Sequence, residues 1–143
     1  MTVYVIDASV ASRFLLVEDL SDEARSVLED LLEGSVRLEA PRLVVYEVGN
    51  TLWKAVKRGY ATSDEASQKF SYFLSLKIDS VEFSAVDHKE VLEWSLKNDA
   101  TYYDSAYVRA SKKTKASLLT ADDLLHSKAR KAVPTVHLKD YRK

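Results

Sequence analysis

The chain has 143 residues, no cysteine and a formal net charge of −1 at pH 7. This length can bury a sizeable core, so we expect a single domain over residues 1–143. The lack of cysteine excludes disulfides, thiolate zinc sites and thiol nucleophiles. No apolar run has the length of a membrane span, and Asp7 interrupts the apolar start where a signal peptide would continue. We therefore expect a cytoplasmic protein that has no membrane partner.

The charges are unevenly distributed along the chain. Residues 109–143 carry ten Lys or Arg and three Asp, a net +7, whereas the rest carries 11 basic and 19 acidic residues, a net −8. A basic segment suits a polyanion such as RNA, and a solvated face of ordinary helices explains it equally well. Asn occurs only at positions 50 and 98 and Gln only at 68, a scarcity of amides that is typical of heat-adapted proteins.

The first predicted element is a strand over residues 3–6. Its sequence Val-Tyr-Val-Ile is continuously apolar or β-branched, as in a buried strand of a parallel sheet. Asp7 follows at the carboxyl end of this strand, where ligands bind in open α/β sheets. Asp is also a favoured helix N-cap, so capping of the helix predicted over residues 8–17 is the competing interpretation of Asp7.

Turn and cap signals divide the next part of the chain. Ser21 is predicted to cap a second helix, and a short strand over residues 36–40 leads to Pro41 as the first residue of a third helix. Residues 62–65 have the spacing of a capping box and should open a fourth helix. A strand with an imperfect pattern is expected over residues 78–83.

The third helix, over residues 42–58, carries two polar residues of interest. Its apolar residues recur at three- and four-residue spacing, which indicates one buried face. Glu47 lies within its first two turns, and Asn50 lies three residues further on, hence on the same face.

The remaining elements alternate in the same way. Asp87 to Glu90 has the spacing of a cap and should open a helix that ends near Asn98. The elements that follow are a helix that begins near Thr101 and contains Asp104, a buried strand over residues 116–120, a helix over 123–131, and a last strand over 133–138 whose Pro134 argues for a sheet edge. The order β-α-α-β-α-α-β-α-α-β-α-β predicts a three-layer α/β/α sandwich with a central, mainly parallel sheet.

Four carboxylates are expected to meet at one rim of this sheet. Asp7 and Asp122 follow the carboxyl ends of strands, while Glu47 and Asp104 lie in the first turns of helices that begin at the same rim. Such a group would repel itself strongly unless a cation neutralised it. Carboxylate oxygens suit the hard cations Mg²⁺ and Mn²⁺, which can activate a water and stabilise charge on a phosphate.

Four short motifs in this order resemble one known family. They are Val5-Ile6-Asp7-Ala8-Ser9-Val10, Glu47-Val48-Gly49-Asn50, Tyr103-Asp104-Ser105-Ala106-Tyr107 and Leu118-Leu119-Thr120-Ala121-Asp122. Together they closely resemble the PIN-domain ribonucleases, and within them the small VapC-type toxins of toxin–antitoxin pairs. The resemblance runs from the first strand to about Leu138 and implies a metal-dependent endoribonuclease of PIN-like fold.

The resemblance also implies roles for individual residues. Asp7, Glu47, Asp104 and Asp122 would be the catalytic acids that bind Mg²⁺ or Mn²⁺. Thr120 would contact the metal or a metal-bound water, and Asn50 would orient Glu47 or a water. The doublet Asp122-Asp123 leaves open which acid binds the metal; the Thr-x-Asp spacing favours Asp122, with Asp123 as an auxiliary ligand or a residue of the helix N-terminus. The implied partners are a single-stranded or looped RNA, an antitoxin and a second copy of the chain.

Other interpretations remain open from the sequence. A phosphotransferase of the haloacid dehalogenase type would need a second Asp where Ser9 stands, and a response-regulator receiver would need further acids near residue 10. A stand-alone PIN nuclease of RNA maturation and a non-catalytic PIN-like binding module are the remaining alternatives. The module is disfavoured because such proteins lose one or more of the acids, whereas all four are present here. The three histidines have no predicted chemistry, and Arg13 is expected to form a surface ion pair rather than to bind a phosphate.

Overall fold

The computed structural model describes residues 1–142; Lys143, a member of the basic C-terminal segment, lies outside the described residues. Within residues 1–142, five strands form one sheet in the order β3-β2-β1-β4-β5, and every neighbouring pair is parallel. The strands are β1 (Thr2–Ile6), β2 (Val36–Pro41), β3 (Ile78–Val81), β4 (Ser117–Thr120) and β5 (Thr135–His137).

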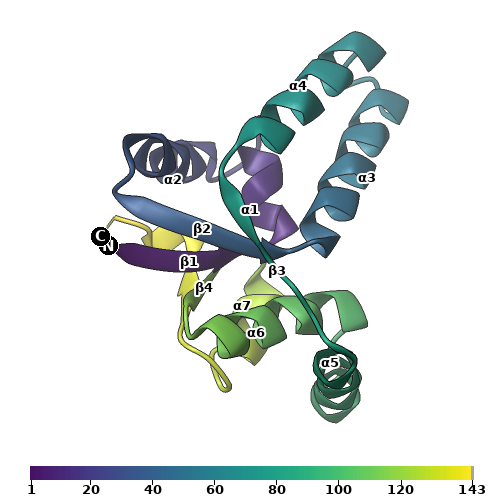
Figure 1. Cartoon of the computed structure of the whole chain (residues 1–143). Coiled ribbons are helices and arrows are strands. Elements are labelled where there is room, and N and C mark those ends of the chain that lie inside the picture. The colour runs from purple at the N-terminus through teal and green to yellow at the C-terminus, as the bar shows by residue number, and fades with distance from the viewer. Residues whose placement is uncertain (143) are drawn as a thin grey trace.

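Helices cover both faces of this sheet (Figure 1). On one face lie α1 (Ala8–Arg13), α2 (Ser21–Glu33), α3 (Leu43–Lys57) and α4 (Ser63–Ser75). On the other lie α5 (Ala85–Asn98), α6 (Tyr102–Thr114) and α7 (Asp123–Ala129), and a short 3₁₀ helix, Leu138–Asp140, follows β5. The α3–α4 pair extends beyond the sheet edge in Figure 1. The predicted three-layer α/β/α architecture and the predicted order of elements are confirmed.

The central strand is β1, and its position in the sheet decides where Asp7 lies. β1 pairs with β2 on one side and with β4 on the other, with Ile6 opposite Leu119. The chain therefore leaves β1 in one direction, toward β2 and β3, and returns on the other side with β4 and β5. A reversal of strand order of this kind opens a crevice at the carboxyl ends of the two strands. Asp7 follows β1 at that point, and Thr120 ends β4 beside it.

The core explains why these strands are central. Val5, Ile6, Leu118 and Leu119 are fully buried, and so is Val48 of α3. Burial of each such side chain away from water contributes roughly 1.5–3 kcal/mol to the free energy of unfolding. Helices thus cover both faces of β1 and β4, which is why these strands are continuously apolar, as in other parallel sheets.

Two predicted helix starts are wrong, although the helices themselves are present. Leu20, in a left-handed conformation with φ 62°, precedes α2, and the Ser21 hydroxyl instead accepts a hydrogen bond from the Glu18 backbone N–H at 2.8 Å. Pro41 is the last residue of β2, paired with Val81, and does not open α3. Helix α2 thus begins one residue earlier than a Ser21 cap would allow, and β2 runs one residue further than predicted before Arg42 caps α3.

The start of α5 and the end of α1 also differ from prediction. The N-cap of α5 is Ser84, not Asp87, and Asp87 is the N3 residue of the same capping box. The Asp87 carboxylate also pairs with Lys113 at 2.6 Å and with Arg109 at 2.7 Å, so it joins α5 to α6. Helix α1 ends at Arg13, several residues earlier than predicted. The capping box of Thr62 and Glu65 and the edge position of β5 are confirmed.

The two ends of the chain lie together in Figure 1. The Tyr141 hydroxyl donates to Asp30 Oδ2 of α2 at 2.6 Å, and its ring meets the Tyr4 ring edge-on at 5.9 Å. These contacts fix the last described turn against β1 and α2. Within the described part of the chain, every helix is too short or too polar to cross a lipid bilayer.

Candidate active site at the carboxyl rim of the sheet

Asp7 is a buried carboxylate, with only 4% of the residue exposed. It is the N-cap of α1, where Oδ1 accepts a hydrogen bond from the Val10 backbone N–H at 3.2 Å. The capping role is therefore real, but it uses only part of the carboxylate. Burial raises the pKa of Asp7 to about 6, even though its hydrogen bonds favour the ionised form.

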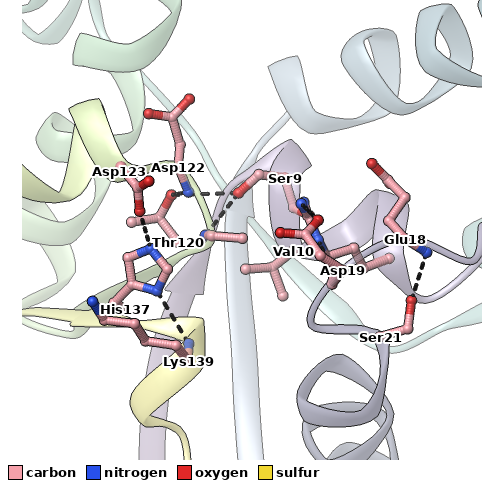
Figure 2. Close-up of polar contacts among 12 residues, drawn as sticks. Ser9, Val10, Glu18, Asp19, Ser21, Thr120, Asp122, Asp123, His137 and Lys139 are labelled. Atoms are coloured by element: carbon pink, nitrogen blue, oxygen red, sulfur yellow. Dashed lines mark hydrogen bonds and ion pairs between the residues drawn. The ribbon is translucent and has the colours of Figure 1, made fainter.

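Two hydroxyls orient the Asp7 carboxylate. Ser9 Oγ donates to Oδ1 and Thr120 Oγ1 donates to Oδ2, each at 2.6 Å. Both hydroxyls also accept backbone N–H groups of the turn after β4, Ser9 from Ala121 at 2.9 Å and Thr120 from Asp122 at 3.0 Å. Figure 2 shows this connection between Ser9, Thr120 and Asp122. The ends of β1 and β4 are thereby joined into one rigid unit around Asp7.

Glu47 is held by a tyrosine from the opposite layer. It lies in the second turn of α3 and is half-buried, and the Tyr107 hydroxyl of α6 donates to its Oε1 at 2.5 Å. Burial raises the pKa of Glu47, and the negative charge of Asp104 raises it further. Tyr107 is itself 1% exposed, so this bond fixes one carboxylate oxygen and leaves Oε2 for another partner.

Asp104 is the acid whose charge interacts with those of Asp7, Glu47 and Asp122. It is in the first turn of α6, where its backbone N–H donates to the Thr101 cap at 3.0 Å. Burial raises the pKa of Asp104, and the charge of Asp122 raises it further. The charge of Asp104 in turn raises the pKa of both Asp7 and Glu47. The charge of Asp104 therefore interacts with the charges of the other three acids.

The two acids of the doublet point in different directions (Figure 2). Asp122 is the N-cap of α7; its Oδ1 accepts from the Leu125 backbone N–H at 2.8 Å. Asp123 points to β5, where its Oδ1 lies 2.7 Å from Nε2 of His137. The charge of Asp122 raises the pKa of Asp104, whereas the Asp123 carboxylate contacts His137.

The donor set fits a hard divalent cation. It consists of anionic oxygens in a partly buried setting, where burial raises the pKa values of Asp7, Glu47 and Asp104 and neighbouring negative charges add to the rise. Within residues 1–142, however, no three Asp, Glu or His side chains already stand as a finished metal cage.

The other residues singled out in the sequence have simpler positions. Asn50 is exposed on α3, and the hydrogen bond to the Glu47 carboxylate within the described residues comes from Tyr107. Arg13 pairs with Asp19 at 2.9 Å, which confirms the predicted surface ion pair. Lys128 of α7 donates to the Asp99 carbonyl, and its charge lowers the pKa of Asp104. It is thus a cation near the rim.

Sequence reasoning missed three contributors to this site, namely Ser9, Tyr107 and His137. Ser9 follows Asp7 by two residues, a spacing at which a hydroxyl can reach a capping carboxylate. Tyr107 lies one helical turn after Asp104, so its position on the same face was visible in the spacing. His137 is 14 residues from Asp123, and no local pattern points to that contact.

Comparison with known proteins places these residues in context. The PIN domain model matches residues 4–131. The chain is 34% identical to ribonuclease VapC3 of Pyrobaculum aerophilum over 128 residues, which are 87% of this chain and 92% of that protein.

Two solved structures are similar in fold. PAE2754 from Pyrobaculum aerophilum has a TM-score of 0.72 at 24% identity, with 96% of this chain and 90% of that chain covered. VapBC2 from Rickettsia felis, solved bound to a DNA fragment from their promoter, has a TM-score of 0.69 at 15% identity, with 95% and 98% covered. At these identities the likeness concerns the fold alone.

Proposed function

Because the chain belongs to the PIN domain family, and within it to the VapC proteins, we propose that it is a Mg²⁺- or Mn²⁺-dependent endoribonuclease and the toxin of a toxin–antitoxin pair. The observation that supports this proposal is that the charge of Asp104 interacts with those of Asp7, Glu47 and Asp122, beside the reversal point of the sheet. The similarity to a protein named ribonuclease VapC3 supports RNA as the substrate.

The metal would be held by Asp7, Glu47, Asp104 and Asp122, and when bound it would supply an activated water and positive charge for the scissile phosphate. The chain's own part is to prepare the ligands. Ser9 and Thr120 orient the two oxygens of Asp7, and Tyr107 orients Glu47. These bonds stabilise the ionised carboxylates, which burial alone would disfavour. The prepared anionic rim thus favours a divalent cation over a neutral ligand.

The RNA and protein partners follow from charge and from the relatives. Exposed basic residues of the segment 109–142 would contact phosphates of a single-stranded or looped RNA. Part of the positive excess is already used inside the fold, since Arg109 and Lys113 pair with Asp87 and Arg142 with Asp30. A VapB-type antitoxin and a second copy of the chain are the proposed protein partners. The fold shared with VapBC2 supports the antitoxin.

The decisive experiment is cleavage of RNA by the purified protein with Mn²⁺, with Mg²⁺ and with excess EDTA. Circular single-stranded RNA has no ends, so its cleavage would establish endonuclease activity. We expect Asp104→Asn to lower the rate by at least about a hundredfold, because a lost charged ligand weakens both metal binding and water activation. Asp64→Asn is a matched control, because Asp64 is an exposed acid in the first turn of α4.

Three results would contradict the proposal. They are cleavage that persists in EDTA, cleavage by Asp104→Asn at the wild-type rate, and RNA binding without cleavage under every metal condition. The last result would favour the binding-module alternative. Co-expression with the protein encoded beside this chain would separate a toxin from a stand-alone nuclease, because only a toxin should lose activity in the resulting complex.

A further inference from the structure

The turn of residues 120–123, between β4 and α7, carries Asp122. Its first residue, Thr120, is fully buried and bonded to Asp7. Its last residue, Asp123, is bonded to His137 at the end of β5. The turn is therefore held at both ends, and Asp122 lies between the two attachments (Figure 2).

The hydrogen bonds of His137 define its tautomer. The Lys139 backbone N–H donates to Nδ1 at 3.1 Å, so Nδ1 carries no proton. Nε2 therefore carries the proton and donates it to Asp123 Oδ1 at 2.7 Å. The His137 side chain is only 4% exposed, and the residue pairs with Thr120 across the sheet. It is thus a fixed donor on a rigid strand.

Within residues 1–142, Asp123 makes no side-chain hydrogen bond or ion pair other than the one to His137. Its side chain is 93% exposed, so packing does not set its direction. The bond to His137 ties Asp123 to β5, next to the edge-on contact between the rings of His126 and His137 at 5.4 Å. Because α7 begins at Asp123 and its N-cap is Asp122, the bond between His137 and Asp123 holds the residue directly after Asp122 against β5.

We propose that His137 and Asp123 are positioning residues, which aim the Asp122 carboxylate at Asp104 and so complete the cation site. The inference rests on the proposed function, since it assumes that Asp122 is a ligand. It assigns a role to a buried histidine that the proposed mechanism does not use. It also assigns Asp123 to support rather than to ligation, because Asp123 points toward β5 while Asp122 acts on Asp104.

The test is Mn²⁺ binding by the metal-free full-length protein, measured by calorimetry and by the Mn²⁺-induced rise in the unfolding midpoint. Asp123→Ala and His137→Phe each remove one half of the bond, and each should weaken Mn²⁺ binding about tenfold, as is usual for groups that orient a ligand. Asp123→Asn keeps an acceptor oxygen and should restore most of the affinity. Asp64→Ala, at another exposed first-turn acid, controls for loss of charge at a helix N-terminus.

The double variant Asp123→Ala/His137→Phe adds a second criterion. If the pair acts as one unit, the double variant should bind Mn²⁺ no more weakly than the worse single variant. With RNA at saturating Mn²⁺, the same variants should lower kcat and leave KM within about twofold, since they do not contact the strand.

Several outcomes would overturn the inference. Wild-type Mn²⁺ affinity in Asp123→Ala would show that the turn needs no such support. Equal loss in Asp123→Asn and Asp123→Ala would make Asp123 a charged ligand instead. Additive losses in the double variant would separate the two residues. If His137→Phe does not fold, the exposed Asp123 variants still decide. If the wild type binds Mn²⁺ but cleaves no RNA, the proposed function fails while these binding comparisons still test the inference.

Discussion

Replacement of Asp7 by Asn should stabilise the metal-free protein at pH 8 and change its stability little at pH 4. The pKa of Asp7 is raised from 3.8 to about 6, chiefly by burial. A raised folded pKa means that the native state binds the proton more tightly, so the group stabilises the fold below its unfolded pKa. This stabilisation is lost as the pH rises from about 4 through about 6, and at pH 8 the buried charge is a net cost.

The size of the effect follows from the shift. One pKa unit corresponds to about 1.36 kcal/mol, so the shift of Asp7 corresponds to about 3 kcal/mol. Asn has an acceptor oxygen and an NH2 donor group where a protonated Asp has an acceptor oxygen and an O–H donor, and it is an equally good N-cap. Its amide would face Thr120, whose hydroxyl can turn toward Ser9 Oγ, 3.4 Å away. With some loss for this rearrangement, we expect a gain of about 2 kcal/mol at pH 8.

Urea unfolding of wild type and Asp7→Asn in EDTA, at pH 4, 6 and 8, measures this difference. Saturation with Mn²⁺ at a hundred times its Kd should stabilise the wild type by about 2.7 kcal/mol and the variant by much less, so that their order reverses. The reasoning is refuted if the variant is equally destabilised at all three pH values, or if Mn²⁺ stabilises both proteins alike. Asp7 would then be a structural cap.

Three further predictions concern the rest of the molecule. Asp87→Asn should lower the unfolding midpoint at pH 7, because Lys113 and Arg109 hold the pKa of Asp87 well below its usual 3.8; that loss should shrink as the pH falls below about 4, and a pH-independent loss would contradict it. Thermal unfolding should occur above roughly 80 °C, and a midpoint of about 45–65 °C would refute the interpretation of the amide scarcity. The slope of the logarithm of RNA affinity against the logarithm of salt concentration should become shallower by about 0.7 for each phosphate contact that is removed. An unchanged slope would mean that the basic segment 109–142 is only a solvated face. The residues to replace by Ala are Lys112, Lys115, Arg130 and Lys131.

The order of strands and helices could be predicted because it depends on local patterns. The apolar runs of β1 and β4 and the helical spacing of α3 are properties of a few adjacent residues. The positions of Asp7 and Asp104 followed from the same patterns, since a parallel sheet brings the carboxyl ends of its strands to one rim. Helix starts were less predictable, as at Ser21 and Pro41, because several neighbouring residues can serve and the path of the chain between layers selects one.

The sequence by itself determined which acidic residues follow the strands or begin the helices, and so which are expected at the carboxyl rim, where parallel strands end together. Only the tertiary structure decided how each carboxylate is held. Tyr107 reaches Glu47 from the opposite face of the sheet, and His137 reaches Asp123 from the neighbouring strand. Asp122 and Asp123 are the same type of residue and adjacent in sequence, yet their carboxylates have different partners. Side-chain direction depends on donors that lie far away in the chain, and these come within reach only when the layers pack together.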